Sequence, residues 1–297
     1  MRRFIKFSLI FIIPLAVFFV TLEAMVLRIP NDYSYKYDYV KEHGSSIKVI
    51  AIGHSQLLNG FIPEVYGDST FNLSNAGQRY IDDYYILHEL IDSLHNLRQV
   101  IIPIGYLDVV DALSDTTLQE LSVYYHEYMH LDYDGKLPLG HYFECFNIRQ
   151  TCGKLIKHYI LGEAVLSCEK HGERYKPKNK NIYSTTNVLY TYTVKKDVDM
   201  KIQDGYYLER LLELLIGKKI KVLLVSPPYL WSLFRDKNED QISFHNSYVN
   251  NLLKRYDVTY IDLQDSDYFS KEDYADVAHL SFKGAHKFTS LLRQYNN

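Results

Sequence analysis

A serine in the first quarter of the chain and a histidine near its end are the residues best suited to chemistry. Ser55 follows Gly53-His54 directly after an apolar run, and Asp276 precedes His279 by three residues. A serine hydroxyl at a strand-to-helix turn can attack a carbonyl group, because the helix N-terminus stabilises the negative charge that develops. A carboxylate that accepts the Nδ1 proton of an imidazole leaves Nε2 ready to take the serine proton. Together these residues indicate nucleophilic acyl transfer, whereas each segment alone is more typical of a helix cap or a loop.

Other loops carry residues suited to binding a substrate. Asn75-Ala76-Gly77 follows a second apolar run, and a glycine there lets the backbone offer its N–H at close range. Gly105-Tyr106-Leu107-Asp108 follows a third run, and Asp108 either contacts substrate or caps a helix, of which capping is the commoner role. Arg79 is a further candidate for binding substrate. Tyr229 and Trp231 are candidates because aromatic rings at such an edge can stack on sugars.

Apolar runs that alternate with helical patterns predict the elements that position these residues. The expected strands are 47–52, 70–73, 99–104, 221–225 and 258–263, and the expected helices are 81–94, 198–216, 240–256 and 282–295. This alternation predicts an α/β fold with a doubly wound, mostly parallel five-stranded sheet. Ligands of such sheets bind beyond the carboxyl ends of the strands, where the chemical segments fall.

The N-terminal segment has the pattern of a membrane anchor. Arg2, Arg3 and Lys6 precede an uncharged run from Phe7 to Leu22, and the apolar stretch continues to residue 27. About 20 such residues span the hydrocarbon core, and the preceding basic residues predict a cytoplasmic N-terminus. We therefore expect a transmembrane helix over 1–27 with the rest of the chain on the extracytoplasmic side. A cleaved secretory signal is the alternative, but no small-x-small cleavage site follows the run.

Beyond the anchor, the chain divides into a linker and one large domain. Residues 28–46 read as a polar linker, and 47–297 as a catalytic domain with an insertion at about 112–195. Helices are expected within that insertion over 117–129 and 154–168.

Composition excludes several classes of protein. Hydrophobic residues make up 47% of the chain and charged residues 23%, which rules out a disordered chain and a transporter with many spans. The formal net charge is −3, whereas a nucleic-acid-binding protein usually carries a basic excess, so we expect no nucleic-acid partner. The three cysteines lie at 145, 152 and 168 with no C-x-x-C spacing, which makes a cysteine zinc site a poor interpretation.

A second, minor interpretation is a zinc enzyme. His126-Glu127-Tyr128-Met129-His130 has the H-E-x-x-H order, which on a helix places two imidazoles on one face. A five-residue pattern arises easily by chance in a chain rich in His and Tyr, and the α/β alternation fits a zincin badly. We expect no metal and no other cofactor.

Two motifs at the ends of the large domain carry a resemblance to a known family. The closing motif is Asp276-x-x-His279-Leu280-Ser281-x-x-Gly284, and the opening motif is Gly53-His54-Ser55-x-x-x-x-Gly60-x-x-Pro63. Together they resemble the SGNH (GDSL-like) hydrolase and acyltransferase superfamily, over residues 47–295. The chain is most similar to membrane-anchored members that transfer acyl groups at the cell surface, such as D-alanyl transfer proteins of teichoic acid and alginate O-acetylation proteins. The resemblance implies the flavodoxin-like SGNH fold.

The same resemblance implies roles for individual residues. Ser55 is the implied nucleophile, His279 the base and Asp276 the acid that orients it. The backbone N–H groups of Ser55 and Gly77 are the implied oxyanion hole.

This chain departs from the family pattern at two positions. His54 stands where many members have Asp. Leu107 stands where the family has an Asn that donates to the oxyanion, and leucine has no donor. Loss of one such donor typically lowers turnover by roughly 10²–10³-fold. Asn75, Gln56 and Arg79 are nearby in sequence and are candidates to replace it.

The expected function is that of a serine acyltransferase or esterase acting on cell-envelope glycans through an acyl-enzyme. The implied partners are a glycan or other acyl acceptor, a membrane acyl-donor protein and the membrane itself. The alternative is a catalytically inactive module of the same fold that binds a glycan or a partner, an interpretation that the leucine at position 107 supports.

Overall fold

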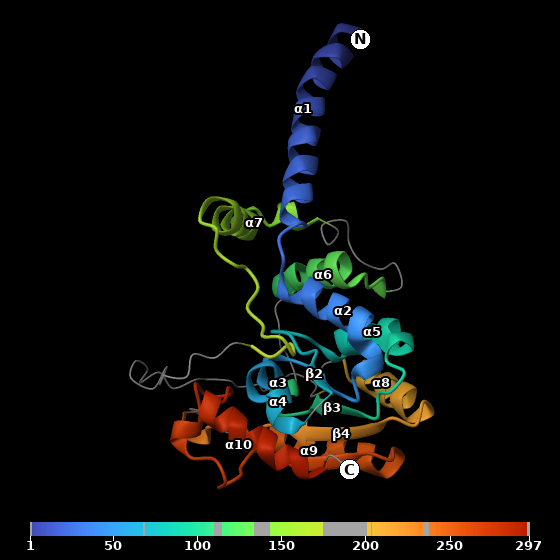
Figure 1. Cartoon of the computed structure of the whole chain (residues 1–297), viewed down its shortest axis with the longest axis vertical. Coiled ribbons are helices and arrows are strands. Elements are labelled where there is room, and N and C mark those ends of the chain that lie inside the picture. The colour runs from blue at the N-terminus through green and yellow to red at the C-terminus, as the bar shows by residue number, and fades with distance from the viewer. Residues whose placement is uncertain are drawn as a thin grey trace. The chain divides into compact units, whose positions relative to one another are not determined.

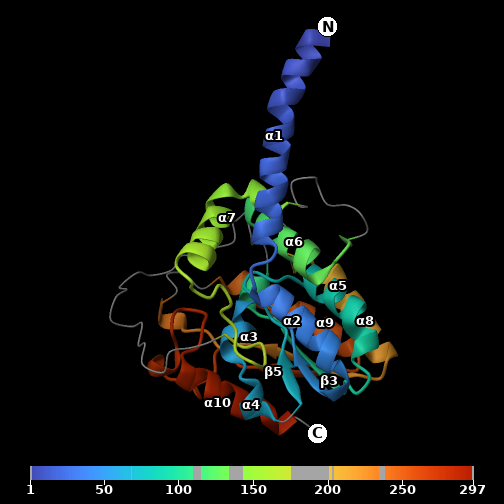
Figure 2. The ribbon, with the colours of Figure 1, turned by 45° about the horizontal axis from the view of Figure 1, so that its top comes forward.

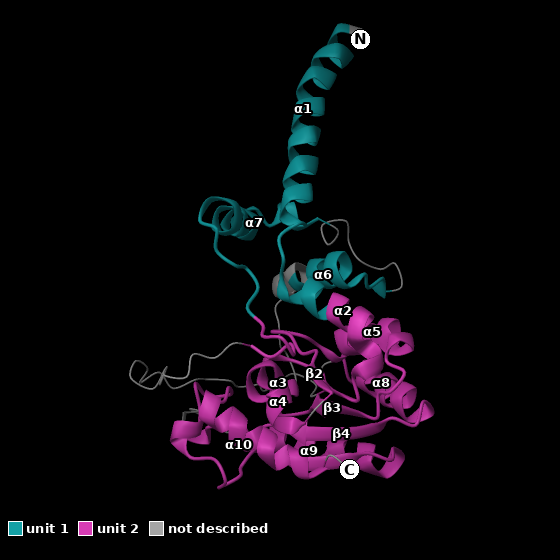
Figure 3. Ribbon diagram, in the orientation of Figure 1, with its two compact units in different colours: residues 1–37, 114–167 teal, residues 38–113, 168–297 magenta. Residues whose placement is uncertain are grey.

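The computed structural model describes residues 2–67, 69–109, 115–133, 143–174, 201–202, 204–233 and 238–295. The chain forms two compact units (Figure 3). The smaller unit contains Met1–Tyr37 and Ser114–Ser167, and the larger contains Asp38–Leu113 and Cys168–Asn297.

The larger unit is built on one parallel sheet of five strands (Figure 1). The strands are β1 (Val49–Ala51), β2 (Thr70–Asn72), β3 (Gln99–Pro103), β4 (Lys221–Ser226) and β5 (Thr259–Asp262). Each neighbouring pair is parallel, and the spatial order is β2-β1-β3-β4-β5. This is the flavodoxin-like order of doubly wound α/β folds, so the predicted fold class is confirmed.

Helices cover both faces of the sheet. On one face lie α3 (Ser55–Gly60), α4 (Pro63–Tyr66) and α10 (Phe282–Leu292), which share an apolar core with alternate residues of β1, β3 and β4. On the other face α8 (Gly205–Gly217) packs on β4, α5 (Tyr80–Leu90) packs on α8, and Tyr248 of α9 (Glu239–Arg255) bonds to Gly205 (Figure 2). The central strands β1, β3 and β4 are therefore buried on both sides, which explains why they are largely continuous apolar runs, whereas the edge strand β5 is partly exposed.

The smaller unit is helical. It contains α1 (Arg2–Val26), the first part of α2 (Asp32–His43), α6 (Asp115–Met129) and α7 (Ile148–Leu155), which continues as a π-helical turn over Ile156–Ile160. Short 3₁₀ turns complete the two units at Gly44–Ser46, Ile91–Ser93, Tyr106–Asp108, Glu144–Phe146, Trp231–Leu233, Lys271–Asp273 and Arg293–Tyr295.

Helix α1 contains one candidate membrane span. Within Arg3–Val26, the most apolar 18-residue stretch has a mean hydropathy of 2.5, and only 6% of that stretch is buried within the protein. By length and composition this helix is able to cross a membrane, which agrees with the predicted N-terminal apolar helix.

Three local expectations from the sequence need correction. Residues 28–46, expected as a polar linker, contain helix α2, with Asn31 accepting from the N–H groups of Tyr33 and Ser34 at its start. The rings of its tyrosines are partly or fully buried, so residues that count as polar in sequence supply an apolar helix face. The helix expected over 154–168 is instead α7, which ends at the π-turn, and the helix expected over 198–216 is α8. The expected helix start at residue 198 and much of the insertion, over 175–200, lie outside the described residues.

Gly53, between β1 and α3, occupies a position that only glycine fits. Its φ is +139°, and a Cβ there would lie 2.5 Å from the ring of Pro103 at the end of β3. The turn that leads into α3 therefore depends on the missing side chain.

We predict that Gly53→Ala destabilises the protein by at least about 1–3 kcal/mol, because backbone strain at positive φ adds to the overlap with Pro103. Gly217→Ala is the matched control, since a Cβ at that last residue of α8 meets nothing within 4 Å. The control is expected to be neutral or stabilising by up to about 1 kcal/mol. Urea unfolding in detergent measures both, and equal effects of the two substitutions would contradict the prediction.

Candidate active site

Ser55, His279 and Asp276, which the sequence predicts to act together, lie side by side at the carboxyl edge of the sheet. Ser55, the first residue of α3, has its Oγ 2.8 Å from Nε2 of His279. Nδ1 of the same ring lies 2.8 Å from Oδ2 of Asp276 and 3.0 Å from Oδ1. The side chains of His279 and Asp276 remain 31% and 36% exposed, so the relay of hydrogen bonds is open to solvent on one side.

The carboxylate of Asp276 is held in its charged form. Burial by itself raises the pKa of this carboxyl, but the hydrogen bond and charge of His279 outweigh burial, as do the N–H groups of Ala278 and His279, each 2.9 Å from Oδ1. The pKa of Asp276 therefore lies below its usual value. A charged carboxylate at Nδ1 favours the proton on that nitrogen, which leaves Nε2 to accept the hydroxyl proton of Ser55.

The loop that carries Asp276 and His279 is fixed from three sides. Gln56, next to the serine, donates from Nε2 to the carbonyl of Ala278 at 3.2 Å. The N–H of Leu230 donates to the carbonyl of Val277 at 3.0 Å. Ser281 ends the loop by capping α10, where its hydroxyl accepts from the N–H of Gly284 at 3.2 Å. The histidine is thus positioned by backbone contacts rather than by its own exposed ring.

His54 caps α3, the helix that begins at Ser55. Its Nδ1 accepts from the N–H of Gln56 at 3.3 Å, so the remaining proton lies on Nε2. Nε2 is buried 3.3 Å from Oδ1 of Asp108, which is close enough for an electrostatic contact but not aligned as a hydrogen bond. The other oxygen of Asp108 accepts from the N–H of Gly105 at 2.6 Å. Asp108 therefore caps its own turn and faces His54 in the turn before α3. The sequence analysis missed this contact because 54 residues separate the two side chains.

The remaining candidates are engaged in local contacts. Asn75 is buried, and its amide donates to Oε1 of Gln78 at 2.8 Å. The guanidinium of Arg79 pairs with Asp82 at 3.3 Å and lies 3.7 Å from Asp204.

Tyr229 also lies inside the protein rather than at an open surface. It is 3% exposed; its hydroxyl donates to Oε1 of Gln56 at 3.3 Å and accepts from the N–H of Leu107 at 3.4 Å. The side chain of Leu107 packs against an apolar cluster made of Tyr106, Tyr229, Val277 and Ala278. Position 107 thus supports the back of the histidine loop and supplies no side-chain donor.

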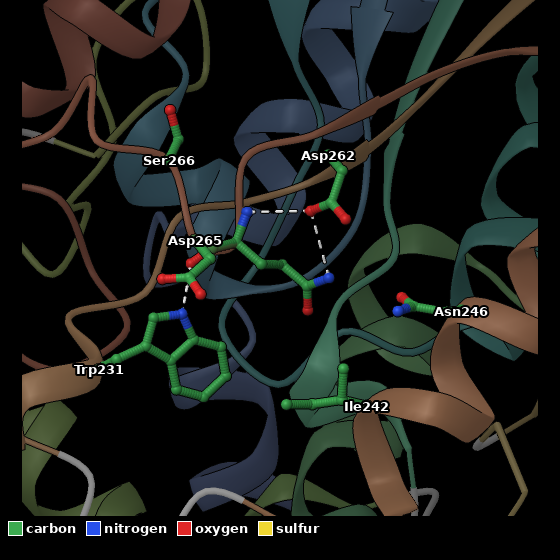
Figure 4. Close-up of a pocket in the computed structure, with 7 residues that line it drawn as sticks. Trp231, Ile242, Asn246, Asp262, Asp265 and Ser266 are labelled. Carbon is green, nitrogen blue, oxygen red and sulfur yellow. Dashed lines mark hydrogen bonds between the residues drawn. The ribbon is translucent and has the colours of Figure 1, made fainter. Parts of the chain in front are cut away.

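A cavity of about 480 Å³ opens beyond the ends of β4 and β5 (Figure 4). Its lining residues are Trp231, Ile242, Asn246, Asp262, Gln264, Asp265 and Ser266. Trp231 donates from Nε1 to the backbone carbonyl of Gln264 at 2.6 Å, which fixes the indole at the wall. Trp231 and Ile242 also pack against the apolar cluster behind the histidine loop, so the cavity and the loop share a wall.

The structure disfavours the zinc alternative. His126 lies in α6, with Nδ1 3.0 Å from the carbonyl of Leu131. His130 lies beyond the end of the helix at φ +56°, so the two rings do not repeat on one helical face. Among the residues that the structure describes, no group of three or more His, Cys, Asp and Glu side chains is arranged to hold a metal ion.

Comparisons with known proteins give weak likenesses. A protein-family model matches residues 191–296, less than half of the chain. No curated protein matches the chain. Among solved structures, a protein described as a platelet activating factor from Streptococcus pneumonia is similar at 13% identity and a TM-score of 0.44, with 96% of this chain and 98% of the other covered.

Two further solved structures are similar at the same level. An acylhydrolase from Bacteroides fragilis shares 12% identity at a TM-score of 0.41, with 86% of this chain and 93% of the other covered. A GDSL-like lipase from Bacteroides thetaiotaomicron shares 12% identity at a TM-score of 0.41, with 89% and 97% covered. Likeness at this level carries no argument about function, and the fold class rests on the strand order of the sheet itself.

We predict that His54→Ala lowers the free energy of unfolding by about 0.5–2 kcal/mol, the usual effect of losing an N-cap. His54→Asn restores most of this loss, because Asn caps helices well although it does not reach Asp108 in the same way. Chemical unfolding of the two variants tests the cap, which would be refuted if Asn were no better than Ala.

The lowered pKa of Asp276 predicts a pH dependence of stability. An aspartate that titrates at about 3.9 in the unfolded chain and lower in the folded one stabilises the fold above that pH. This stabilisation is lost as the pH falls through the folded value. We therefore expect the free energy of unfolding, measured with urea, to be higher for wild type than for Asp276→Asn at pH 7. The difference between the two proteins should narrow below about pH 4. A gap that stays constant across this range would show that Asp276 is not held charged by its partners.

Proposed function

We propose that this protein is a serine acyltransferase or esterase that works through an acyl-enzyme. The observation that carries the proposal is the continuous hydrogen-bonded arrangement of Ser55, His279 and Asp276. The hydroxyl of Ser55 attacks the acyl carbonyl carbon while its proton passes to Nε2 of His279, and Asp276 stabilises the imidazolium. The tetrahedral intermediate expels the leaving alcohol, which takes the proton from His279.

The second half of the reaction runs in reverse with a new nucleophile. A hydroxyl group of the acceptor, or water, loses its proton to Nε2 of His279 as its oxygen attacks the acyl carbon. The bond to Ser55 breaks and the serine recovers its proton from His279. The same groups serve transferase and esterase, and the acceptor that reaches the acyl-enzyme decides between them.

In this proposal the backbone N–H groups of Ser55 and Gly77 stabilise the oxyanion. Ser55 stands at the first position of α3, where helix geometry leaves an N–H without an intrahelical acceptor. Gly77 adopts φ +71° in the turn after β2, a conformation that turns backbone groups toward a neighbouring loop at low cost for glycine.

We propose a cell-envelope glycan as the acceptor and the cavity beyond β4 and β5 as its binding site. The indole of Trp231 offers a face for a sugar ring, and the carboxylates of Asp262 and Asp265 suit sugar hydroxyls. Strands β1 and β5 are three positions apart in the sheet, or roughly 14 Å at the usual strand spacing. An extended saccharide chain of a few rings is long enough to occupy the cavity and present a hydroxyl to Ser55.

The proposed location follows from the N-terminal segment. Helix α1 anchors the protein, the basic residues before it stay in the cytoplasm, and the sheet unit works on the extracytoplasmic side. A membrane protein that delivers the acyl group is the proposed partner, because acyl donors made in the cytoplasm must cross the membrane first.

A binding module without catalysis is the second candidate. The observation that favours it is the lack of a side-chain donor at Leu107, together with the amide of Asn75 being bonded to Gln78. Both candidates keep the fold and the glycan site, but only the first makes a covalent bond.

We predict that a fluorophosphonate probe labels the wild-type chain on Ser55. Ser55→Ala abolishes the label, because the nucleophile is gone. Asp276→Asn slows labelling by about 10³–10⁴-fold, since the amide favours the wrong imidazole tautomer. Mass spectrometry of the labelled peptide and the rate of labelling are the measurements.

His126→Ala and treatment with a chelator are the controls, and both should leave the labelling rate unchanged. Labelling that survives Ser55→Ala would refute the serine mechanism. An unlabelled wild-type chain with intact fold would favour the binding module.

We predict that Trp231→Ala raises the KM for a glycan acceptor about tenfold, the loss expected when one stacking face is removed. Trp231→Phe, which keeps an aromatic face, should lie between this variant and wild type. The KM for a small activated ester should change less than the KM for the glycan. Equal changes in both constants would show that Trp231 acts through the serine site rather than on the acceptor.

A further inference from the structure

The smaller unit exposes a patch of apolar side chains around α7. Seven large apolar residues there are 42–74% exposed: Phe143, Phe146, Ile148, Ile156, Tyr159, Ile160 and Leu161. We call this set the α7 patch. Scattered exposed apolar residues are ordinary on a soluble surface, but a contiguous group of this kind marks an interaction surface.

Three members of the patch form a stripe on one side of a helix that is fixed on another side. Ile156 and Tyr159 follow Ile148 at spacings of eight and eleven residues, and the half-buried Leu155 at a spacing of seven, which places the four on one face. On a different face Thr151 is buried, with its hydroxyl donating to the carbonyl of Glu144 at 2.8 Å.

A buried polar network ties α7 to the body of its unit. The carboxylate of Glu144 accepts hydrogen bonds from Lys154 of α7 and from the hydroxyl of Tyr128 in α6. The ammonium of Lys154 also lies 4.2 Å from the ring centroid of Tyr124. The polar network fixes α7 in place, so the exposed stripe does not result from fraying of the helix.

The patch adjoins the end of the candidate span. Glu23, near the end of α1, accepts from the N–H groups of Glu144 at 2.9 Å and Cys145 at 2.8 Å. The hydroxyl of Tyr159 donates to the carbonyl of Met25 at 3.1 Å. Figure 1 shows α7 beside the C-terminal end of α1 and running across its direction.

The length of α1 determines where its contact with α7 lies along the membrane normal. A hydrocarbon core of ~30 Å takes about 20 helical residues, so a span that begins after Lys6 ends near Val26. Glu23 then lies within one turn of the far boundary, where two backbone donors compensate its charge. The patch lies at the level of the headgroups.

The charges near the patch suit an anionic lipid surface. Arg149 and Lys157 are basic residues of this segment outside the polar network, whereas Lys154 is paired with Glu144. Between Glu144 and Glu163 the segment has no acidic residue. A helix with an apolar stripe, an aromatic residue at its edge and basic residues beside the stripe is the pattern of a helix that lies in the membrane interface.

We propose that α7 lies in the extracytoplasmic membrane interface, with the α7 patch facing the acyl chains and with Arg149 and Lys157 among the headgroups. The occupant of the patch is the lipid surface of the same membrane that α1 crosses. Helix α7 and the end of α1 thus form two attachments that fix the orientation of the helical unit on the membrane.

The natural thiol of Cys152 tests this placement in the full-length chain. Cys145 is buried and Cys152 is exposed on α7, so Cys168→Ser leaves Cys152 as the accessible thiol. It is labelled with a polarity-sensitive fluorophore, and the chain is reconstituted in vesicles of phosphatidylcholine and phosphatidylglycerol at about three to one. We expect a blue-shifted emission that is quenched by lipids spin-labelled near the headgroup.

Labels at three further positions compare the lipid exposure of the two sides of α7 and of the span. A label at Ile156→Cys, on the stripe, should behave like the label at Cys152. A label at Lys157→Cys, on the opposite side, should show a smaller blue shift and less quenching. A label at Val17→Cys in α1 should be quenched by lipids spin-labelled near the end of the acyl chain. The last three labels are placed in chains that carry Cys152→Ser and Cys168→Ser.

Two outcomes would overturn the proposal, and they are distinguishable. If Val17→Cys is quenched but Cys152 and Ile156→Cys are no more quenched than Lys157→Cys, the span stands and α7 does not lie on lipid. Because these vesicles contain no other protein, a patch that serves a protein partner would give this same result. If Val17→Cys is not quenched by the deep label, α1 does not span the bilayer and the placement of α7 fails with it.

Discussion

The packing of α10 against α3 and α4 is the contact on which the candidate site depends. The serine and the histidine are 224 residues apart in sequence, and each stands at the start of one of these helices or just before it. Thr289 of α10 donates from Oγ1 to the carbonyl of Gly60 at 3.2 Å and accepts from the N–H of Ile62 at 3.0 Å. The ring of Phe288 faces Gly60, where an added Cβ would lie 3.7 Å from it, an ordinary packing distance. Because apolar packing and two hydrogen bonds fix the register of the helices, the 2.8 Å distance between Ser55 and His279 follows from the fold.

The sequence predicts the sheet and the proximity of Ser55, Asp276 and His279 well, for a physical reason. Strands that are buried on both faces must be continuous apolar runs, and residues at strand ends gather at one edge whatever their separation along the chain. The site was therefore predictable from Ser55, Asp276 and His279 alone. Helix α2 was missed because tyrosine rings bury while their hydroxyls read as polar. The contact of His54 with Asp108 was missed because it joins two loops whose approach depends on the sheet order.

Position 107 illustrates how one residue serves packing at the expense of chemistry. The turn after β3 places Leu107 against the rings of Tyr106 and Tyr229 and against Val277 and Ala278 of the histidine loop. An amide in that cluster would lose hydration and need a buried partner. The backbone N–H of Leu107 is meanwhile bonded to the hydroxyl of Tyr229, which also reaches Gln56 beside the nucleophile. The leucine thus helps to hold the loop over residues 276–279 in place and supplies no side-chain donor to an oxyanion.

The proposed oxyanion hole is made of backbone groups, and such a hole works only where the backbone is held still. The turn that contains Gly77 is held by a chain of buried polar contacts. The N–H of Asn75 donates to the carbonyl of Gly53 at 3.1 Å, and its side-chain amide donates to Gln78 at 2.8 Å. Gln78 in turn donates to Asp83 of α5 at 2.6 Å, and burial raises the pKa of Asp83 well above its usual value despite that bond. A network of buried polar groups of this kind is costly to disturb, because each of its groups loses its partner when one is removed. This network holds the turn after β2 against the turn that precedes Ser55. The backbone N–H groups of Ser55 and Gly77, the two proposed donors, therefore keep a constant separation.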